Sequence, residues 1–284
     1  MQRSSRGEAL TVEEQANLER VRQAIRERAA GKSPKMAANG CIGGRSAVMW
    51  AWDGGETLPK AEQERLERQM DLLRMSKINR GGKAGVGKDT WPTLAERIAT
   101  AGLSPLQVQA CWLKQVEANP KPLGEFPAHA RALQADITTI LQIAKQRYPN
   151  LRVVYLSSRT FGGWSGRESG SPEPYAYESG FGTRWIGQRQ IAGDPALNFD
   201  AARGEVQAPL VLWGPYLWAQ GNTLRSFDGL MWTQNDVRED QLHPSAAGCG
   251  TTTALLLNFF KTNEGTSRWF LKSGATTPAA PLPE

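Results

Sequence analysis

The spacing of apolar and polar positions predicts helices and strands that alternate through the middle of the chain. Apolar residues recur at helical spacing over residues 124–148, and continuous apolar runs over residues 106–113 and 151–156 predict buried strands. These segments together predict a right-handed β-α-β unit, and residues 208–213 predict a further strand. The pattern therefore predicts an α/β fold with a central parallel sheet, in which the run around Val153 is the central strand.

The two ends of the chain differ from this middle part. Thr11 and Glu14 form a capping box at the start of a helix that extends to Ala30, and its narrow apolar stripe indicates a surface position. A short strand over residues 35–39 leads into a glycine-rich turn at residues 40–44. Further helices are predicted over residues 59–75, 91–101, 179–191 and 251–261. The chain is thus divided into a charged leader and helix (1–34), an α/β domain (35–271) and a disordered tail (272–284).

Composition indicates a globular protein and limits the classes of partner that we expect it to bind. The chain has 284 residues, of which 40% are hydrophobic and 22% are charged, enough for one large α/β domain. Its net charge of +6 is not gathered into a basic stripe between aromatic residues, so no nucleic-acid partner is expected. No apolar run approaches the roughly 18 residues of a membrane span, and the charged N-terminal segment holds no secretory signal. Oligomeric state and compartment stay open.

The cysteines and one glycine-rich loop offer little chemistry. Cys41, Cys111 and Cys249 are an odd number without a C-x-x-C motif, so neither a disulfide framework nor a zinc site is expected. Cys41 and Cys249 flank motif residues and are candidates to lie close together. Residues 81–90 nearly spell a phosphate-binding loop, but Asp89 replaces the hydroxyl residue that would hold magnesium, and no buried strand precedes it. We interpret this segment as a flexible basic loop and expect no metal or cofactor.

The candidate chemistry lies in residues 236–248, which hold Asp240 and His243 in a D-x-x-H turn. Histidine exchanges a proton near neutral pH, and an acidic neighbour that accepts from its ring N–H fixes the tautomer that a general base requires. A serine hydrolase needs such a pair. Taken alone, these residues are more simply interpreted as a surface loop with a capping aspartate. The other motifs of the chain decide between the two interpretations.

Several segments carry further motifs in a fixed order. They read N-G-C-I-G-G-R-S from Asn39, V-Q-A-C-W-L-K-Q from Val108, V-V-Y-L-S-S-R-T-F-G-G-W from Val153 and D-Q-L-H-P-S from Asp240. In this order they resemble the later blocks of the SGNH (GDSL-type) hydrolase superfamily. The chain is more closely similar to an uncharacterised bacterial branch, through Y-A-Y-E-S-G-F from Tyr175 and W-G-P-Y-L-W from Trp213. The resemblance covers residues 35–270.

The resemblance implies a flavodoxin-like three-layer sandwich with a central parallel sheet, and it assigns roles to four residues. His243 would be the general base, and Asp240 the acid that orients it. The backbone N–H of Gly44, or that of Gly43, would donate to the oxyanion. All of these residues belong to loops able to reach the carboxyl edge of the sheet, where such folds bind ligands.

The chain departs from the superfamily at the third block. That block normally reads G-x-N-D, and W-L-K-Q stands in its place. Lys114 or Gln115 would then supply the oxyanion donor that Asn usually gives. A structural ion pair is an equal alternative for Lys114.

The block that normally carries the nucleophilic serine is missing from the resemblance. Ser4, Ser5 and Ser33 do not follow an apolar strand, and Ser46 lies on the wrong side of the glycine turn. No G-x-S-x-G elbow occurs in the chain. We therefore expect both the nucleophile and the first strand of the fold to be absent from this sequence.

Two functions are expected from these observations. The first is an SGNH-like serine ester hydrolase that acts on a small-molecule or carbohydrate ester, with acylated carbohydrate as the expected substrate class, inactive as given because its nucleophile segment is absent. The alternative is a non-catalytic member of the same fold that binds a glycan or another small ligand, with Trp50, Trp164 and Trp218 as stacking surfaces.

Overall fold

Three parallel strands form the centre of the protein, seen here in a computed structural model. They are β1 (Ala110–Lys114), β2 (Val153–Ser157) and β3 (Leu210–Trp213), in the order β1-β2-β3. β2 is therefore the central strand, as its apolar run predicts. The structure describes residues 38–42, 44–53, 57–75, 89–166 and 170–271.

The predicted β-α-β unit is confirmed as β1, α5 (Ala128–Arg147) and β2, with β1 and β2 parallel. Apolar residues of α5 at helical spacing, such as Leu133, Ile137 and Leu141, are almost fully buried against the sheet. α5 begins at Ala128 rather than at residue 124, because Gly124 adopts a φ of +97°, outside the right-handed helical region.

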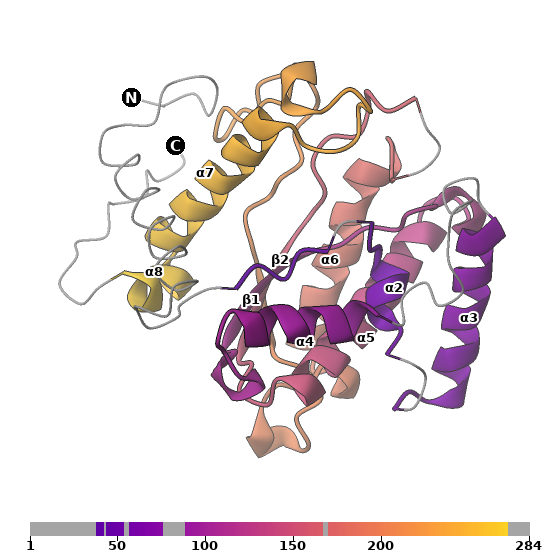
Figure 1. Ribbon diagram of the computed structural model, residues 1–284, viewed down its shortest axis with the longest axis vertical. Helices are drawn as coiled ribbons and strands as arrows, with labels where there is room; N and C mark the ends of the chain where they lie inside the picture. Colours follow the sequence, from indigo (N-terminus) through magenta and orange to yellow (C-terminus); the bar gives the residue numbers. More distant parts are fainter. Residues whose placement is uncertain (1–37, 43, 54–56, 76–88, 167–169, 272–284) are drawn as a thin grey trace.

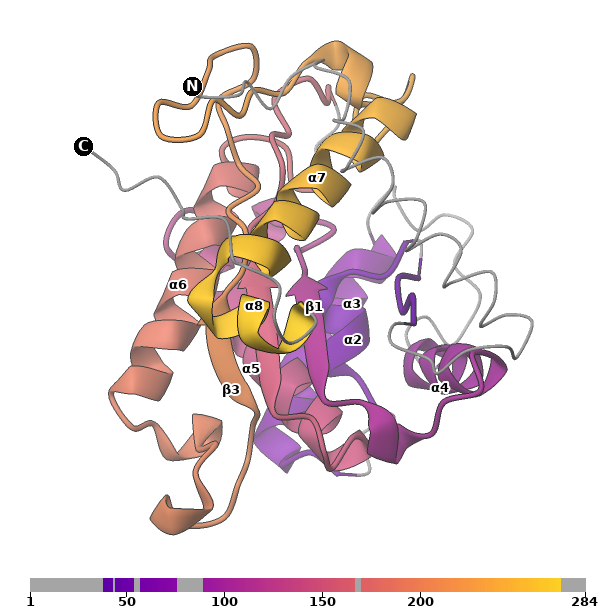
Figure 2. The ribbon, with the colours of Figure 1, turned by 90° about the vertical axis from the view of Figure 1, so that its left-hand side faces the viewer.

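Helices cover both faces of the sheet, so the described part of the chain is an α/β fold (Figures 1 and 2). One face carries α5 and α6 (Tyr175–Ile191), and α2 (Ala47–Ala51) packs on α5. Two outer helices, α3 and α4, contact α2. The opposite face carries α7 and α8. Their bounds are Lys60–Met75 for α3, Thr90–Thr100 for α4, Ala246–Thr262 for α7 and Glu264–Phe270 for α8.

The main hydrophobic core lies between the sheet and α5. Val154 and Leu156 of β2 are 1% exposed and pack in the same cluster as Ile186 of α6 and Leu66 of α3. The apolar residues at helical spacing on α3, Leu66, Met70 and Leu73, are buried in this core. A stripe of this width on an otherwise charged helix needs one apolar surface to cover it, and α2 provides that surface.

The second face of the sheet is sealed by aromatic side chains. The ring of Tyr155 in β2, which is 1% exposed, lies against Phe259 and Phe260 of α7 and against Trp269 of α8. The Tyr155 hydroxyl donates to the carbonyl oxygen of Gly265 (3.2 Å) and accepts from Trp269 Nε1 (3.1 Å). Tyr155 therefore ties the central strand to the C-terminal helices.

Two strand predictions are wrong in extent. The segment 106–113 was expected to be one buried strand, but Pro105–Gln107 is a 3-10 turn and β1 is only half-buried. Ser104 and Gln107 cap this turn reciprocally, and that local capping replaces strand pairing. Ala38 and Asn39 form no strand, and residues 35–37 lie outside the described part.

The remaining elements are present with shifted ends. α6 begins at Tyr175 instead of residue 179, and β3 begins at Leu210, directly after Pro209, which has no N–H to pair. α7 begins at Ala246 instead of residue 251, because Ser245 caps it by accepting from the N–H of Gly248 (3.2 Å). Four more 3-10 turns occupy Lys121–Leu123, Pro195–Leu197, Ala201–Arg203 and Gln234–Asp236.

Some predictions fall on residues that are not described. These are the helix from Thr11, most of the basic loop at residues 81–90, the tail from residue 272 and the backbone of Gly43. Among the helices that are described, none has the length and apolar character needed to cross a membrane.

Candidate functional site

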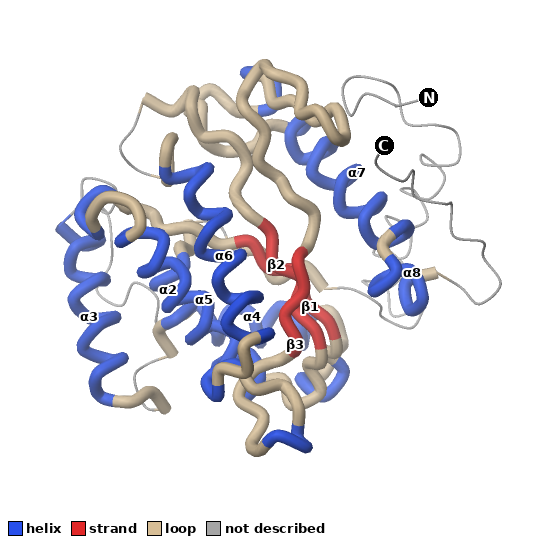
Figure 3. Tube along the Cα trace, turned by 180° about the vertical axis from the view of Figure 1, so that it is seen from behind, coloured by secondary structure: helices blue, strands red, loops and turns tan. Residues whose placement is uncertain are grey.

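The loops that follow the strands meet at one end of the sheet. β1 ends at Lys114, β2 at Ser157 and β3 at Trp213, and parallel strands place their carboxyl ends on a common edge. The hydroxyl of Ser157 donates to the carbonyl oxygen of Pro215 (2.7 Å), which ties the loop after β3 to the end of β2. Figure 3 shows these loops gathered at the end of the sheet from which α7 begins. Ligands of parallel α/β sheets bind at this edge.

The structure brings Asp240 and His243 together in one tight loop. Asp240 Oδ2 lies 2.5 Å from His243 Nδ1, and Asp240 Oδ1 accepts from the backbone N–H groups of His243 (3.0 Å) and Leu242 (3.1 Å). These hydrogen bonds, above all the one from the His243 side chain, hold the pKa of Asp240 well below its usual range. An ionised Asp240 fixes the proton of His243 on Nδ1 and leaves Nε2 as the acceptor.

A small hairpin closes this loop. The backbone N–H of Arg238 donates to the carbonyl oxygen of His243 (2.8 Å), and Val237 forms an antiparallel bridge with Pro244. Gln241 at the tip has a φ of +56°. The side chain of His243 remains 58% exposed, so the imidazole is accessible to a ligand.

The Asp240–His243 loop contacts Gly170, which in turn is bonded to the segment that follows β1. A side chain at Gly170, which has a φ of +82°, would overlap Leu242. The backbone N–H of Gly170 donates to the carbonyl oxygen of Ala118 (2.7 Å), four residues beyond the end of β1 at Lys114. This chain of contacts holds the Asp240–His243 loop at the carboxyl edge of the sheet.

The glycine turn approaches the same edge from α2. The backbone N–H of Ala47 donates to the carbonyl oxygen of Val116 (2.9 Å), and Gly44 has a φ of +72° with open space where a side chain would lie. Ser46 is 5% exposed, and its hydroxyl has no hydrogen-bond partner among the described residues. Within that part of the chain, no hydrogen bond joins His243 to Gly44, Ser46 or Lys114.

Two positively charged side chains occupy the carboxyl ends of β1 and β2. Burial, and then the charge of Arg159, lowers the pKa of Lys114 to about 8. Burial lowers the pKa of Arg159 to about 10, although the negative charge of Glu173 opposes this. Sequence reasoning named Lys114 but missed Arg159. An arginine two residues beyond a predicted buried strand was the available signal.

Glu173, also missed, anchors the excursion that follows β2. Its Oε1 accepts from the N–H of Gly162 (3.0 Å) and from Trp218 Nε1 (2.9 Å), and its Oε2 accepts from the N–H of Tyr177 (3.0 Å). Because Tyr177 lies in the first turn of α6, this carboxylate also favours the start of that helix. The segment 161–177 therefore has a defined structure where it is described.

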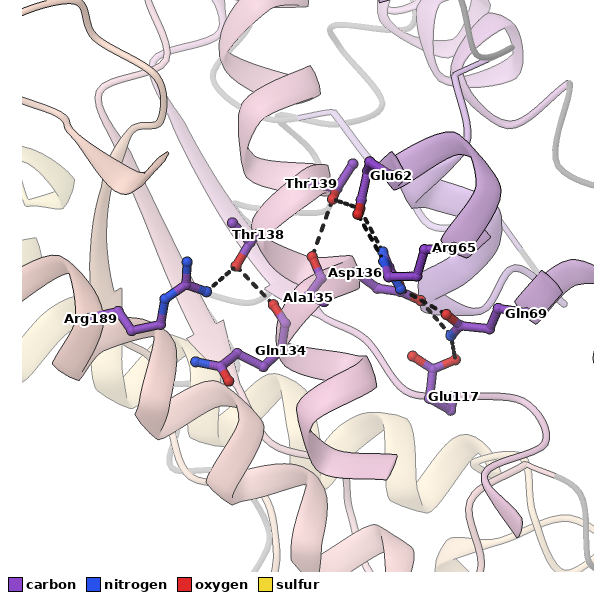
Figure 4. Close-up of polar contacts among 10 residues, drawn as sticks. All are labelled: Glu62, Arg65, Gln69, Glu117, Gln134, Ala135, Asp136, Thr138, Thr139 and Arg189. Atoms are coloured by element: carbon purple, nitrogen blue, oxygen red, sulfur yellow. Dashed lines mark hydrogen bonds and ion pairs between the residues drawn. The ribbon is translucent and has the colours of Figure 1, made fainter. Parts of the chain in front are cut away.

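A buried polar network lies behind the edge, between α3, α5 and the loop after β1 (Figure 4). Arg65 Nη1 contacts Asp136 Oδ1 (2.6 Å), and Gln69 Nε2 donates to both Asp136 Oδ2 (2.8 Å) and Glu117 Oε2 (3.0 Å). Burial, and then the charge of Asp136, raises the pKa of Glu117 well above its usual value. The backbone carbonyl of Glu117 accepts from the Ser171 hydroxyl (2.6 Å), so the network supports the segment that carries the edge.

The three tryptophans expected to offer stacking surfaces do not all do so. Trp50 is 8% exposed and packs edge-on against Trp91 in the core, so its assignment as a stacking surface is wrong. Trp164 is half-buried against Phe161, and Trp218 is half-buried with its N–H bound to Glu173. A tryptophan inside a helix that faces the core cannot be distinguished from a surface one by composition.

Other features of the described residues do not compete with this site. They contain no group of His, Cys, Asp and Glu side chains that could hold a metal ion, and Cys41, Cys111 and Cys249 are free thiols. A pocket of about 260 Å³ lies at the opposite, amino end of β3, between Gln190 and Asn198. The side-chain amides of both residues are bonded to nearby backbone groups.

Comparisons with known proteins do not assign this chain to a family. The chain matches no protein-family model, and no match is found among curated proteins or solved structures.

Proposed function

We propose that this protein is an ester hydrolase of the SGNH type, with acylated carbohydrate as its substrate class. The observation that carries the proposal is the 2.5 Å contact between His243 Nδ1 and Asp240 Oδ2 in a loop at the carboxyl edge of a parallel sheet. A histidine oriented in this way by a carboxylate has the tautomer that the base of a serine hydrolase needs. The ordered motifs that resemble the superfamily support the same conclusion.

Each residue of the proposed site has a chemical role. His243 Nε2 removes the proton of the attacking hydroxyl and later returns it to the leaving alcohol, while Asp240 stabilises the imidazolium. The N–H of Gly44, with Gly43 as the alternative, donates to the oxyanion, and Lys114 is a further candidate donor. No serine hydroxyl of the described residues bonds to His243, so the nucleophile is not assigned.

The finer fold assignment belongs to the same proposal. A parallel sheet with helices on both faces is compatible with the flavodoxin-like three-layer sandwich that the superfamily resemblance implies. What supports it is the position of the candidate pair beyond the carboxyl ends of the strands.

Hydrolysis of 4-nitrophenyl acetate and of an acetylated xylo-oligosaccharide tests the proposed activity. Without an assigned serine, the His–Asp pair can at best activate water, so we expect little or no turnover, and any turnover should be abolished by His243→Ala and lowered by Asp240→Asn. Turnover that survives His243→Ala would show that the base is wrongly assigned. Turnover lost in Ser46→Ala would instead identify Ser46 as the nucleophile.

The alternative is a non-catalytic protein that binds a glycan at the same edge of the sheet. The observation that favours it is that no serine hydroxyl of the described residues bonds to His243, so the described residues offer the base no nucleophile. Calorimetric titration with acetylated and deacetylated xylo-oligosaccharides separates the two functions. Binding of both oligosaccharides without any turnover would favour the alternative.

A further inference from the structure

The carboxyl ends of β1 and β2 bring two cationic side chains to one place. Lys114 is the last residue of β1 and pairs in register with Ser157, the last residue of β2. Side chains alternate along a strand, so Lys114 lies on the same face as Trp112, whose Nε1 donates to Ser157 Oγ (2.9 Å). Arg159 follows two residues after the end of β2. The two cations therefore lie at the ends of adjacent strands, at the edge that binds ligands.

Arg159 is held in place but not neutralised by a direct ion pair. It is 7% exposed, and its Nε donates to the carbonyl oxygen of Ser171 (3.1 Å). In the described part of the chain, no carboxylate lies within ion-pairing distance of its guanidinium. Glu173 acts on it at longer range, but both oxygens of Glu173 already accept hydrogen bonds from other groups.

Lys114, which is half-buried at the end of β1, also lacks a direct partner among the described residues. The neighbouring Ser157 hydroxyl is already used, since it accepts from Trp112 and donates to Pro215. Lys114 forms no hydrogen bond or ion pair with any residue that the structure describes. The groups that act on its charge are Arg159, which opposes it, and the exposed thiol of Cys41.

Buried charges in proteins are normally paired, because desolvation of an isolated charge is costly. Lys114 and Arg159 together carry two positive charges, and Glu173 supplies one negative charge, so one positive charge is left in excess. A single carboxylate would neutralise this excess, whereas a phosphate dianion would leave an extra negative charge beside Glu173. The planar carboxylate also matches the geometry of a guanidinium group.

We propose that Lys114 and Arg159 bind the carboxylate of an acidic sugar, so that the substrate class is an acylated uronate. This inference rests on the proposed function for the ester, while recognition of the carboxylate is independent of any bond cleavage. It assigns to Arg159 a role in binding, and it uses Lys114 to hold the substrate.

Titration of the whole chain with sodium D-glucuronate, with D-glucose as the neutral match, tests the proposal. Binding is followed by NMR of isotope-labelled lysine side chains. We expect glucuronate to bind and glucose not to bind, and glucuronate to raise the pKa of Lys114 above its value of about 8. Above that pH the affinity for glucuronate should fall, because the unprotonated amine no longer attracts an anion.

Variants assign the effect to these residues. Lys114→Gln should weaken glucuronate binding at least about tenfold, which is the order expected for loss of a charge-assisted contact. Lys60→Gln, at a lysine whose side chain is 91% exposed on α3, should leave it unchanged. Arg159→Gln should also weaken binding, and circular dichroism would show whether this variant keeps its fold. The wild-type lysine signal provides a readout that does not depend on any variant.

Three outcomes would overturn the proposal: equal binding of glucose and glucuronate, an unchanged Lys114 signal, or tighter binding of inorganic phosphate than of glucuronate. The outcome for the hydrolase is separate. Glucuronate binding by a chain that cleaves no ester would leave this inference standing and remove the proposed activity. Ester cleavage without glucuronate binding would do the reverse.

Discussion

At the scale of single residues, burial decides which groups carry charge. Glu62 and Asp136 bond to one arginine, Arg65, and Glu117 joins them through Gln69, between α3, α5 and the loop after β1. Three ionised carboxylates around one cation would leave an excess of negative charge, and Asp136 and Glu117 are both buried. Glu117 relieves this excess, because its raised pKa keeps it neutral under conditions in which an exposed glutamate is ionised.

The variant Glu117→Gln tests whether Glu117 is neutral in the folded protein. The folded state raises the pKa of Glu117 above its ordinary value of 4.5, so the stabilisation is complete below that pH and is lost as the pH rises toward the folded pKa. In that window this group should lower the free energy of unfolding by about 1.4 kcal/mol per pH unit. Glutamine mimics the neutral acid, so we expect the variant to lose this slope in urea unfolding measured from pH 5 to pH 9.

An exposed glutamate on α3, the helix that carries Arg65, provides the control. The carboxylate of Glu64 lies 4.0 Å from Lys60 Nζ, with both side chains at least half exposed. Glu64→Gln should therefore retain the wild-type slope. If Glu117→Gln also retained the wild-type dependence of the unfolding free energy on pH, Glu117 would be ionised in the folded protein.

At the scale of elements, α7 is fixed by its first turn. Ser245 caps the helix, and the backbone N–H of Ser245 donates to the carbonyl oxygen of Asp236 (2.9 Å). Gly248, one turn into the helix, lies so close to Asp236 that a side chain there would overlap the Asp236 carbonyl group. The start of α7, and with it the His243 loop, is docked through this close approach.

Two glycines of α7 make a matched pair of variants. Gly248→Ala should destabilise the protein by about 3 kcal/mol, because the added methyl group meets backbone that cannot move aside cheaply. Gly250→Ala, with open space at the same point, should stabilise it by up to about 1 kcal/mol through helix propensity. Thermal unfolding of the two variants provides the comparison, and equal melting temperatures would contradict the docking of α7 on Asp236.

At the scale of the whole molecule, the central strand joins the two helical layers. β2 buries Val154 and Leu156 toward α5, while Tyr155 points to α7 and α8. The Tyr155 hydroxyl is bonded to Gly265 and Trp269, both of α8. The C-terminal helices are therefore attached to the sheet largely through one buried tyrosine and the aromatic rings around it.

Tyr155→Phe should lower the free energy of unfolding by about 1–2 kcal/mol, through the lost hydrogen bonds to α8. The aromatic packing is retained, so the near-ultraviolet circular dichroism of the native state should change little. Tyr177→Phe is the control, since Tyr177 is 42% exposed and its hydroxyl makes no hydrogen bond among the described residues. Denaturant unfolding measures the stability of both variants. Equal stability of the two would mean that the Tyr155 hydroxyl does not hold α8.

The sequence predicted the elements whose apolar pattern is clearest. α5 follows from a long helical periodicity, while β2 and its parallel pairing with β1 follow from short apolar runs on either side of that helix. The contact between Asp240 and His243 was also expected, because a three-residue spacing in a tight turn brings both side chains to one side. These features depend on interactions close in sequence.

The rest depended on contacts between residues far apart in the sequence. Whether Trp50 lies in the core, whether Arg159 joins Lys114 at the sheet edge and whether Glu117 is neutral all follow from packing across elements. The physical reason is that burial changes the free energy of a side chain, and burial is a property of the assembled layers. The sequence alone determined the α/β alternation and the local His–Asp pair, and only the tertiary structure decided which charged groups share one site.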